Sequence, residues 1–216
     1  MDVLAKLGDM QQVLAAREFD VRPLIAMPPA DLRQVAELES AVGTRLPDAF
    51  RDVLLKVSAR VEFRWFAGDR TFAPPFHQNF SGDLHWSVDL TAQVETERKS
   101  WCSEVFSNTG DSYNAVWHDK LAFYEIGNGD LIAFDLAGDK YGQVVYLSHD
   151  DGKGHGYVLA QDFRDLLARW LPLGCTGGED WQWLPFTVGP NSGLQPYAEP
   201  AMTWRRVLGI DSAWGS

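Results

Sequence analysis

One short polar segment, residues 149–155 (HDDGKGH), carries the residue types that could do chemistry. Imidazole nitrogens and carboxylate oxygens bind divalent metal ions, and a carboxylate beside a histidine can take part in acid–base catalysis. A metal site formed by His149, Asp150 and His155 in a hydrolase is therefore one interpretation. The alternative is a polar turn between a strand and a helix, whose glycines allow sharp bends. We favour the turn, because metal ligands are usually held by rigid neighbours.

Sequence motifs of other catalytic classes are absent. No GxSxG nucleophile motif occurs, and Gly152-Lys153-Gly154 lacks the spacing and the following hydroxyl group of a phosphate-binding loop. The two cysteines, Cys102 and Cys175, form no CxxC pair. We therefore expect a protein without enzymatic activity and without a cofactor.

The charge balance narrows the range of partners. The chain has 216 residues, with 19 Lys and Arg against 30 Asp and Glu, and a formal net charge of −11. Direct binding of nucleic acid needs clustered basic side chains for the phosphates, so it is not expected of a chain with this negative field. The same field favours encounter with a basic protein surface.

Three helices are predicted in the first part of the chain. Residues 2–17 and 30–42 carry apolar side chains at helical spacing, and Gly43 terminates the second of these helices. Leu46-Pro47-Asp48 begins the third helix, because proline in a first turn removes no helical hydrogen bond. After it, the patterns predict a strand over 61–65, a long loop over 68–82, a short strand over 84–88 and a helix over 92–107.

The strongest local signal is a β-hairpin. Two β-rich runs, 121–126 and 130–136, are joined by Gly127-Asn128-Gly129, and Asn-Gly supplies the positive φ angles of a type I′ turn. A third strand is predicted over 143–147 and a short fourth strand over 156–159. Residues 163–171 then show the apolar spacing that is typical of a helix packed on a sheet.

Residues 173–216 form a C-terminal extension that is rich in Gly, Pro and Trp. We expect it to fold back onto the core, because loose tails rarely carry so many aromatic side chains; its tryptophans are Trp181, Trp183, Trp204 and Trp214. The chain is then a single domain over 1–216, with an N-terminal helix and linker (1–29), a core (30–172) and this extension. Neither a membrane span nor a secretory signal is predicted, so a cytoplasmic location is expected.

Four segments, at 38–55, 126–135, 142–150 and 159–170, match the pattern of a known family in order. On these residues the chain resembles the SUKH superfamily, which contains fungal cell-wall-assembly regulators and bacterial immunity proteins. The resemblance implies an α+β fold, with a mixed, mainly antiparallel sheet packed by the N-terminal helices and the helix near 160–171. The family-motif residues, which are expected to be structural, are Leu46, Pro47, Gly127, Asn128, Gly129, Asp130, His149, Phe163 and Trp170.

Bacterial members of this family typically bind and neutralise a cognate toxin, often a nuclease or a nucleic-acid deaminase. The resemblance therefore implies an immunity protein that covers a basic toxin surface without performing chemistry. A regulatory or scaffold module remains the alternative, and a metal-dependent hydrolase a further one. The oligomeric state is left open. The candidate contacts are acidic residues on loops that flank the predicted strands: Glu125, Asp130, Asp135, Asp139, Asp150 and Asp151.

Overall fold

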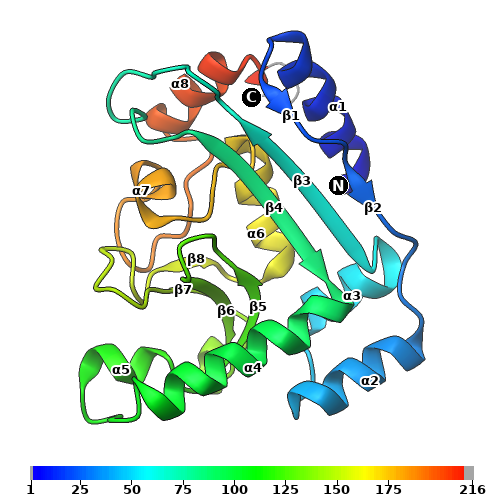
Figure 1. The fold of residues 1–216 in the computed structure, drawn as a ribbon, viewed down its shortest axis with the longest axis vertical. Helices are drawn as coiled ribbons and strands as arrows, with labels where there is room; N and C mark the ends of the chain where they lie inside the picture. Colours follow the sequence, from blue (N-terminus) through cyan, green and yellow to red (C-terminus); the bar gives the residue numbers. More distant parts are fainter. Residues whose placement is uncertain (1, 212–216) are drawn as a thin grey trace.

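The computed structural model describes residues 2–211 and has the α+β fold that the resemblance implied (Figure 1). Its α-helices are α1 (Val3–Ala16), α2 (Leu32–Val42), α3 (Asp48–Lys56), α4 (Val88–Glu104), α5 (Ser112–Val116), α6 (Phe163–Trp170), α7 (Asp180–Trp183) and α8 (Glu199–Leu208). Its strands are β1 (Asp20–Val21), β2 (Ile25–Ala26), β3 (Arg60–Phe66), β4 (Ser81–Ser87), β5 (Lys120–Glu125), β6 (Leu131–Asp135), β7 (Val144–Leu147) and β8 (Val158–Ala160).

The first sheet is built around β3. β4 pairs with one edge of β3, while β1 and β2 pair with the other edge, and all three pairings are antiparallel. Val61, Phe63 and Trp65 are buried, whereas Glu62 and Arg64 between them are not, as the alternating pattern predicted. The sequence analysis missed β1 and β2, because two residues are too few to show a period.

The second sheet has the order β5-β6-β7-β8, again with every pair antiparallel. One face packs against α4, where Val94 and Trp117 belong to a small apolar cluster with the sheet. The other face packs against α3 and α6, where Phe50 and Phe163 contact Phe134. Because both faces are covered, these strands are continuous apolar runs rather than alternating ones. Two antiparallel sheets thus replace the one mixed sheet that was expected.

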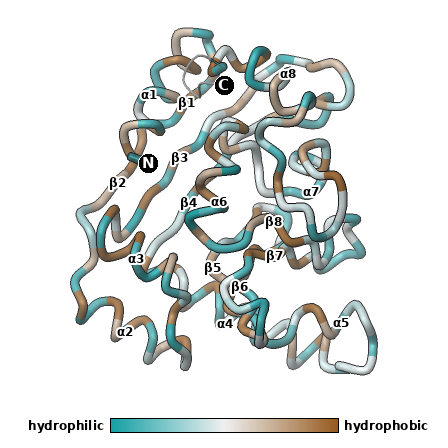
Figure 2. Tube along the Cα trace, turned by 180° about the vertical axis from the view of Figure 1, so that it is seen from behind, coloured by the Kyte–Doolittle hydropathy of each residue, from teal (hydrophilic) through white to brown (hydrophobic). Residues whose placement is uncertain are grey.

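The N-terminal helices are amphipathic, which Figure 2 shows as brown and teal segments alternating along α2 and α3. At the start of α2 the Asp31 side chain accepts a hydrogen bond from the backbone N–H of Gln34, and the Gln34 side chain accepts one from the Asp31 N–H. This reciprocal capping satisfies two amides that the helix itself cannot pair. Of the family-motif residues, Leu46 is buried and Pro47 directly precedes α3.

The hairpin between β5 and β6 is present, but its turn differs from the expected type I′. Of the turn residues, only Gly129 has a positive φ, at 95°. The Ile126 N–H donates to the Asp130 carbonyl at 2.9 Å, and the Gly129 N–H donates to the Ile126 carbonyl at 2.8 Å. This pattern is typical of a three-residue loop with one left-handed residue, so Gly129 alone needs the conformational freedom of glycine.

The C-terminal extension packs into the same apolar core as α1 and the strands. Trp183 and Trp204 are buried, and the core cluster runs from Val3 to Ile210. The Trp65 indole N–H donates to the Gly174 carbonyl at 2.7 Å, which ties the extension to β3. The Trp181 side chain, by contrast, is not part of this core and is 36% exposed. Trp214 lies outside the described residues. No helix within residues 2–211 has both the length and the apolar character needed to cross a bilayer.

Candidate functional site

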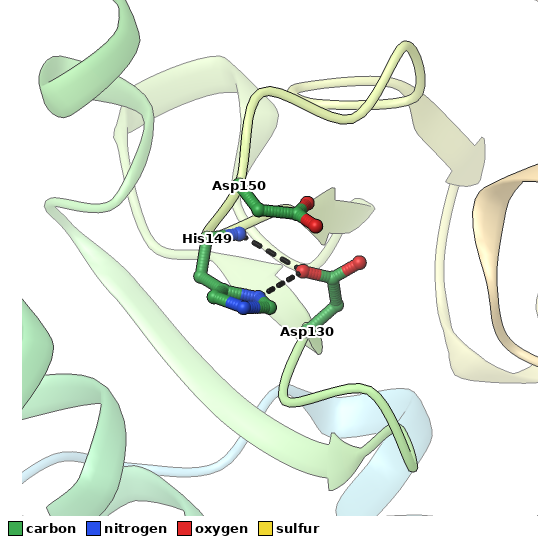
Figure 3. Close-up of side chains that lie close together, drawn as sticks. All are labelled: Asp130, His149 and Asp150. Carbon is green, nitrogen blue, oxygen red and sulfur yellow. Dashed lines mark hydrogen bonds and ion pairs between the residues drawn. The ribbon is translucent and has the colours of Figure 1, made fainter.

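Asp130 is the centre of the polar cluster at the hairpin end of the second sheet. It follows the β5–β6 turn and is 2% exposed. One carboxylate oxygen accepts hydrogen bonds from the His149 N–H at 2.9 Å and from His149 Nδ1 at 2.7 Å (Figure 3). The other accepts from Asn128 Nδ2 at 2.8 Å and from the Tyr146 hydroxyl group. Four donors from two strand ends therefore converge on one buried carboxylate.

These hydrogen bonds set the charge state of Asp130. Burial pushes the pKa of the carboxyl group upwards, but the bonds from Tyr146, His149 and Asn128 outweigh burial and hold the pKa below its ordinary value. Burial and the bond to Asp130 raise the pKa of the Tyr146 hydroxyl group. Asp130 is therefore ionised at neutral pH. Because a carboxylate can only accept, His149 Nδ1 carries the proton in this pair.

The same cluster connects the core to the C-terminal extension. The Tyr146 hydroxyl group accepts a hydrogen bond from the Asp180 N–H at 3.2 Å, at the start of α7. The Asp180 side chain accepts one from the Gly154 N–H at 2.9 Å, in the β7–β8 loop. A Cβ on Gly154 would lie 2.5 Å from the Trp183 ring, so only glycine allows this approach. Glycine is needed at this position because the backbone packs directly against the Trp183 ring, and not because the chain bends there.

The structure corrects the metal hypothesis. His155 lies apart from the proposed ligands and both of its ring nitrogens are engaged: Nδ1 accepts from the Ser148 N–H at 3.0 Å, and Nε2 lies 3.0 Å from the Tyr113 carbonyl oxygen. Burial lowers the pKa of His155, which favours its neutral form. A different trio, Asp130, His149 and Asp150, brings its ligand atoms within 4.8 Å of one another (Figure 3). The lone pairs of Asp130, however, already accept four hydrogen bonds.

A metal ion should therefore not stabilise this protein. Adding about 1 mM Zn²⁺ or Mn²⁺ should leave the unfolding temperature unchanged to within about 1 °C, because coordination would have to displace donors from Asp130. Differential scanning calorimetry with and without EDTA checks this. A concentration-dependent rise in the wild type that is lost in His149→Ala would contradict it and restore the metal hypothesis.

An open pocket of about 480 Å³ lies beside the cluster, and its lining includes residues of the β7–β8 loop and of α7. Four carboxylates line it, from Asp130, Asp150, Asp151 and Asp180, together with the ring of Trp181. Among the described residues that line it, Lys153 is the only base. We call this the acidic pocket. Burial and the charges of Asp130 and Asp180 raise the pKa of nearby Glu179, which is the effect expected of a concentrated negative potential.

The six predicted contact residues do not form one surface. Asp135 and Asp139 lie at the opposite end of the second sheet from the hairpin turn, because β6 runs away from that turn. Asp135 is buried in an ion pair with Lys120 at 3.2 Å, and Asp130 is buried as described above. Both side chains are therefore engaged within the chain and present little surface to a partner. Of the predicted contacts, Asp150 and Asp151 are the exposed ones in the acidic pocket.

Glu125 and Asp139 are exposed elsewhere. Glu125 lines a separate pocket of about 280 Å³ between β4 and the hairpin, with Arg64, Asp83 and His85. Sequence reasoning missed Asp180 and Trp181 as site residues. They lie about thirty positions after Asp150, in a Trp-rich segment without a period, so no local signal joins them to the acidic loop.

Comparisons with known proteins agree with this architecture. A family model described as SMI1 / KNR4 family (SUKH-1) matches residues 29–169, which is more than half of the chain. No curated protein sequence matches the chain. The matched range contains the hairpin, the Asp130 cluster and all but the last residue of α6, and it ends before α7 and α8. The chain therefore belongs to the SMI1/KNR4 family (SUKH-1), as its sequence motifs indicated.

Proposed function

We propose that this chain is a non-catalytic protein-binding domain that neutralises a cognate bacterial toxin by covering its basic active surface. Membership of the SMI1/KNR4 family fits either an immunity or a regulatory role. The observation that carries the proposal is the acidic pocket, where exposed Asp150 and Asp151 stand beside exposed Trp181. Carboxylates steer a basic partner, and tryptophan is among the residues that contribute most to binding energy.

The polar cluster supports a scaffold rather than a catalyst. A catalytic site needs polar groups that are free to contact a substrate. Here the Asp130 oxygens and the His155 nitrogens are engaged by other groups of the chain. These contacts hold the hairpin turn, the end of β7 and the β7–β8 loop in one arrangement, which is what a rigid binding surface requires.

Stoichiometric inhibition is the expected result with the right toxin. The product of the gene adjacent to this one is the partner to test, by mixing the purified proteins and assaying the toxin on nucleic acid. Activity should fall linearly to an end point at a 1:1 ratio, because occlusion consumes one inhibitor per toxin. Raising the salt from about 0.1 to 1 M should slow association, since the steering charges become screened.

Three outcomes distinguish the candidate functions. Protection of co-expressing cells together with the 1:1 end point supports the immunity role. Binding without any loss of toxin activity would contradict occlusion and favour the regulatory or scaffold role. Catalytic turnover of toxin or nucleic acid by the chain, lost in His149→Ala, would overturn the proposal in favour of an enzyme.

A further inference from the structure

The acidic pocket is large enough to receive a side chain of a partner. Its volume of about 480 Å³ lies within the range of roughly 300–1,000 Å³ that is common for small-ligand sites. Asp180 is only 6% exposed, yet it lines the pocket. One of its oxygens accepts the Gly154 N–H, and the other has no hydrogen-bond partner among residues 2–211. A nearly buried carboxylate with one unpaired oxygen therefore lines the pocket.

The negative charge of the pocket is poorly compensated. Across much of the described chain, surface carboxylates lie in ion pairs, such as Asp48 with Arg45 at 2.7 Å and Asp165 with Arg169 at 2.8 Å. Asp150, Asp151 and Asp180 form no such pair within residues 2–211, although Lys153 also lines the pocket. Like charges gathered without counterions are unfavourable in isolation, and a cation delivered by a partner would relieve that repulsion.

One wall of the pocket is aromatic. Trp181 and Trp183 both belong to α7, but Trp183 is buried against Tyr146 whereas Trp181 is exposed at the pocket. An exposed indole face beside carboxylates offers a surface on which a cation can stack. The ligand must then combine a positive charge with a surface that can stack on an indole ring.

We propose that the acidic pocket receives an arginine side chain of the partner, whose guanidinium group stacks on Trp181 and donates hydrogen bonds to Asp180 and Asp150. A planar guanidinium group meets both requirements, because it carries several in-plane donors and stacks on aromatic faces. A lysine ammonium group is a strongly hydrated point charge and satisfies only the first. This proposal rests on the proposed function, for which it names the group recognised on the partner.

The position of the pocket also indicates where partner choice is encoded. Residues 148–153 belong to the family-matched range 29–169, whereas Asp180 and Trp181 lie beyond it. The C-terminal extension therefore supplies Trp181 and Asp180 to the pocket. The loop residues that complete it, 150–153, belong to the range that matches the family model. We expect changes at exposed Trp181 to alter which partner is bound while leaving the core intact.

Binding of a small probe tests the pocket directly. N-acetyl-arginine amide, added up to about 50 mM, should shift the Trp181 indole N–H signal in NMR spectra with a dissociation constant on the order of millimolar. N-acetyl-lysine amide should bind about tenfold more weakly, and N-acetyl-citrulline amide, which is neutral, should not bind. The signal is assigned by its loss in Trp181→Phe.

Variants of exposed residues are used for the test, because they are not expected to disturb folding. Asp150→Asn combined with Asp151→Asn should weaken arginine-amide binding about tenfold or more. Asp139→Asn is the matched control, because it removes one exposed charge at the far end of the second sheet and should leave binding unchanged. Equal affinity for the arginine and lysine probes, no saturable shift, or an unchanged affinity in Trp181→Ala, followed there by the backbone amide signals of residues 150–153, would each overturn the proposal.

The two proposals fail in different ways. If the arginine probe binds as described but no neighbouring toxin is neutralised, the pocket stands and the immunity function fails. If the wild type and Trp181→Ala neutralise the toxin with equal dissociation constants, the immunity function stands and the arginine pocket fails. A loss of neutralisation in Trp181→Ala but not in Asp139→Asn supports both.

Discussion

A chain truncated after residue 172 should fail to fold, although it contains the whole family-matched range. The extension fills the core with Trp183, Phe186 and Trp204, which are at most 1% exposed in the full chain. Removing it would uncover Trp65 and Trp170, whose indole N–H groups donate to carbonyl groups of the extension at 2.7 and 2.6 Å. We expect loss of the near-ultraviolet circular dichroism signal and no cooperative thermal transition.

Point variants of the full chain distinguish the loss of a packed side chain from the loss of the whole extension. Trp204→Ala in the full chain should lower the free energy of unfolding by about 3–5 kcal/mol, the cost typical of removing a buried aromatic ring. Val188→Ala is the control within the same extension, because Val188 is 83% exposed, and it should change stability by less than about 0.5 kcal/mol. A truncated chain that melts cooperatively near the wild-type temperature would contradict this account. It would show that the core folds without the extension.

Much of the fold could be predicted because its elements carry local patterns. The helices over 30–42 and 163–171 and the β-hairpin appear where the apolar spacing and Gly127-Asn128-Gly129 placed them, with boundaries shifted by a few residues. The division into two sheets could not be predicted, because pairing between strands distant in sequence leaves no periodic signal. The edge of β4 is met by residue Thr176, from a segment about ninety positions later.

The candidate site was predicted only in part, for the same reason. His149 and His155 look equivalent in the sequence, yet they play different roles because their partners come from elsewhere: Asp130 for the first and Tyr113 for the second. Trp181 and Trp183 likewise differ by two positions in a helix of four residues, and only packing against Tyr146 decides which one is buried. Asp150 and Asp151 lie exposed on their loop and line the pocket with Asp130, whereas Asp180 and Trp181 of the same pocket were not predicted.

Replacing Asp130 by asparagine should destabilise the protein by about 3 kcal/mol at pH 7, because its carboxylate accepts four hydrogen bonds in a buried position. An amide of the same shape keeps one acceptor oxygen and places its own N–H₂ group against donors such as the Tyr146 hydroxyl group. Urea unfolding monitored by tryptophan fluorescence measures the difference. Glu125→Gln, an exposed change in the same hairpin, is the control and should stay within about 0.5 kcal/mol of the wild type.

The pH dependence of the stability difference between wild type and Asp130→Asn tests whether the negative charge of Asp130 causes that difference. The pKa of Asp130 lies below its ordinary value of 3.8, so the unfolded chain binds the proton more readily than the folded one. The stabilisation is therefore complete at pH values above about 4 and is lost as the pH falls through the lower, folded-state pKa. Burial lowers the pKa of His155 and the charge of Asp130 acts against that shift, so below the ordinary value of 6.5 His155 destabilises the variant slightly more than the wild type. The stability difference between wild type and Asp130→Asn should thus persist from pH 7 to 5 and shrink below pH 4; a difference that persists unchanged at the lowest pH would show that shape, rather than the ionised carboxylate, holds the hairpin to β7.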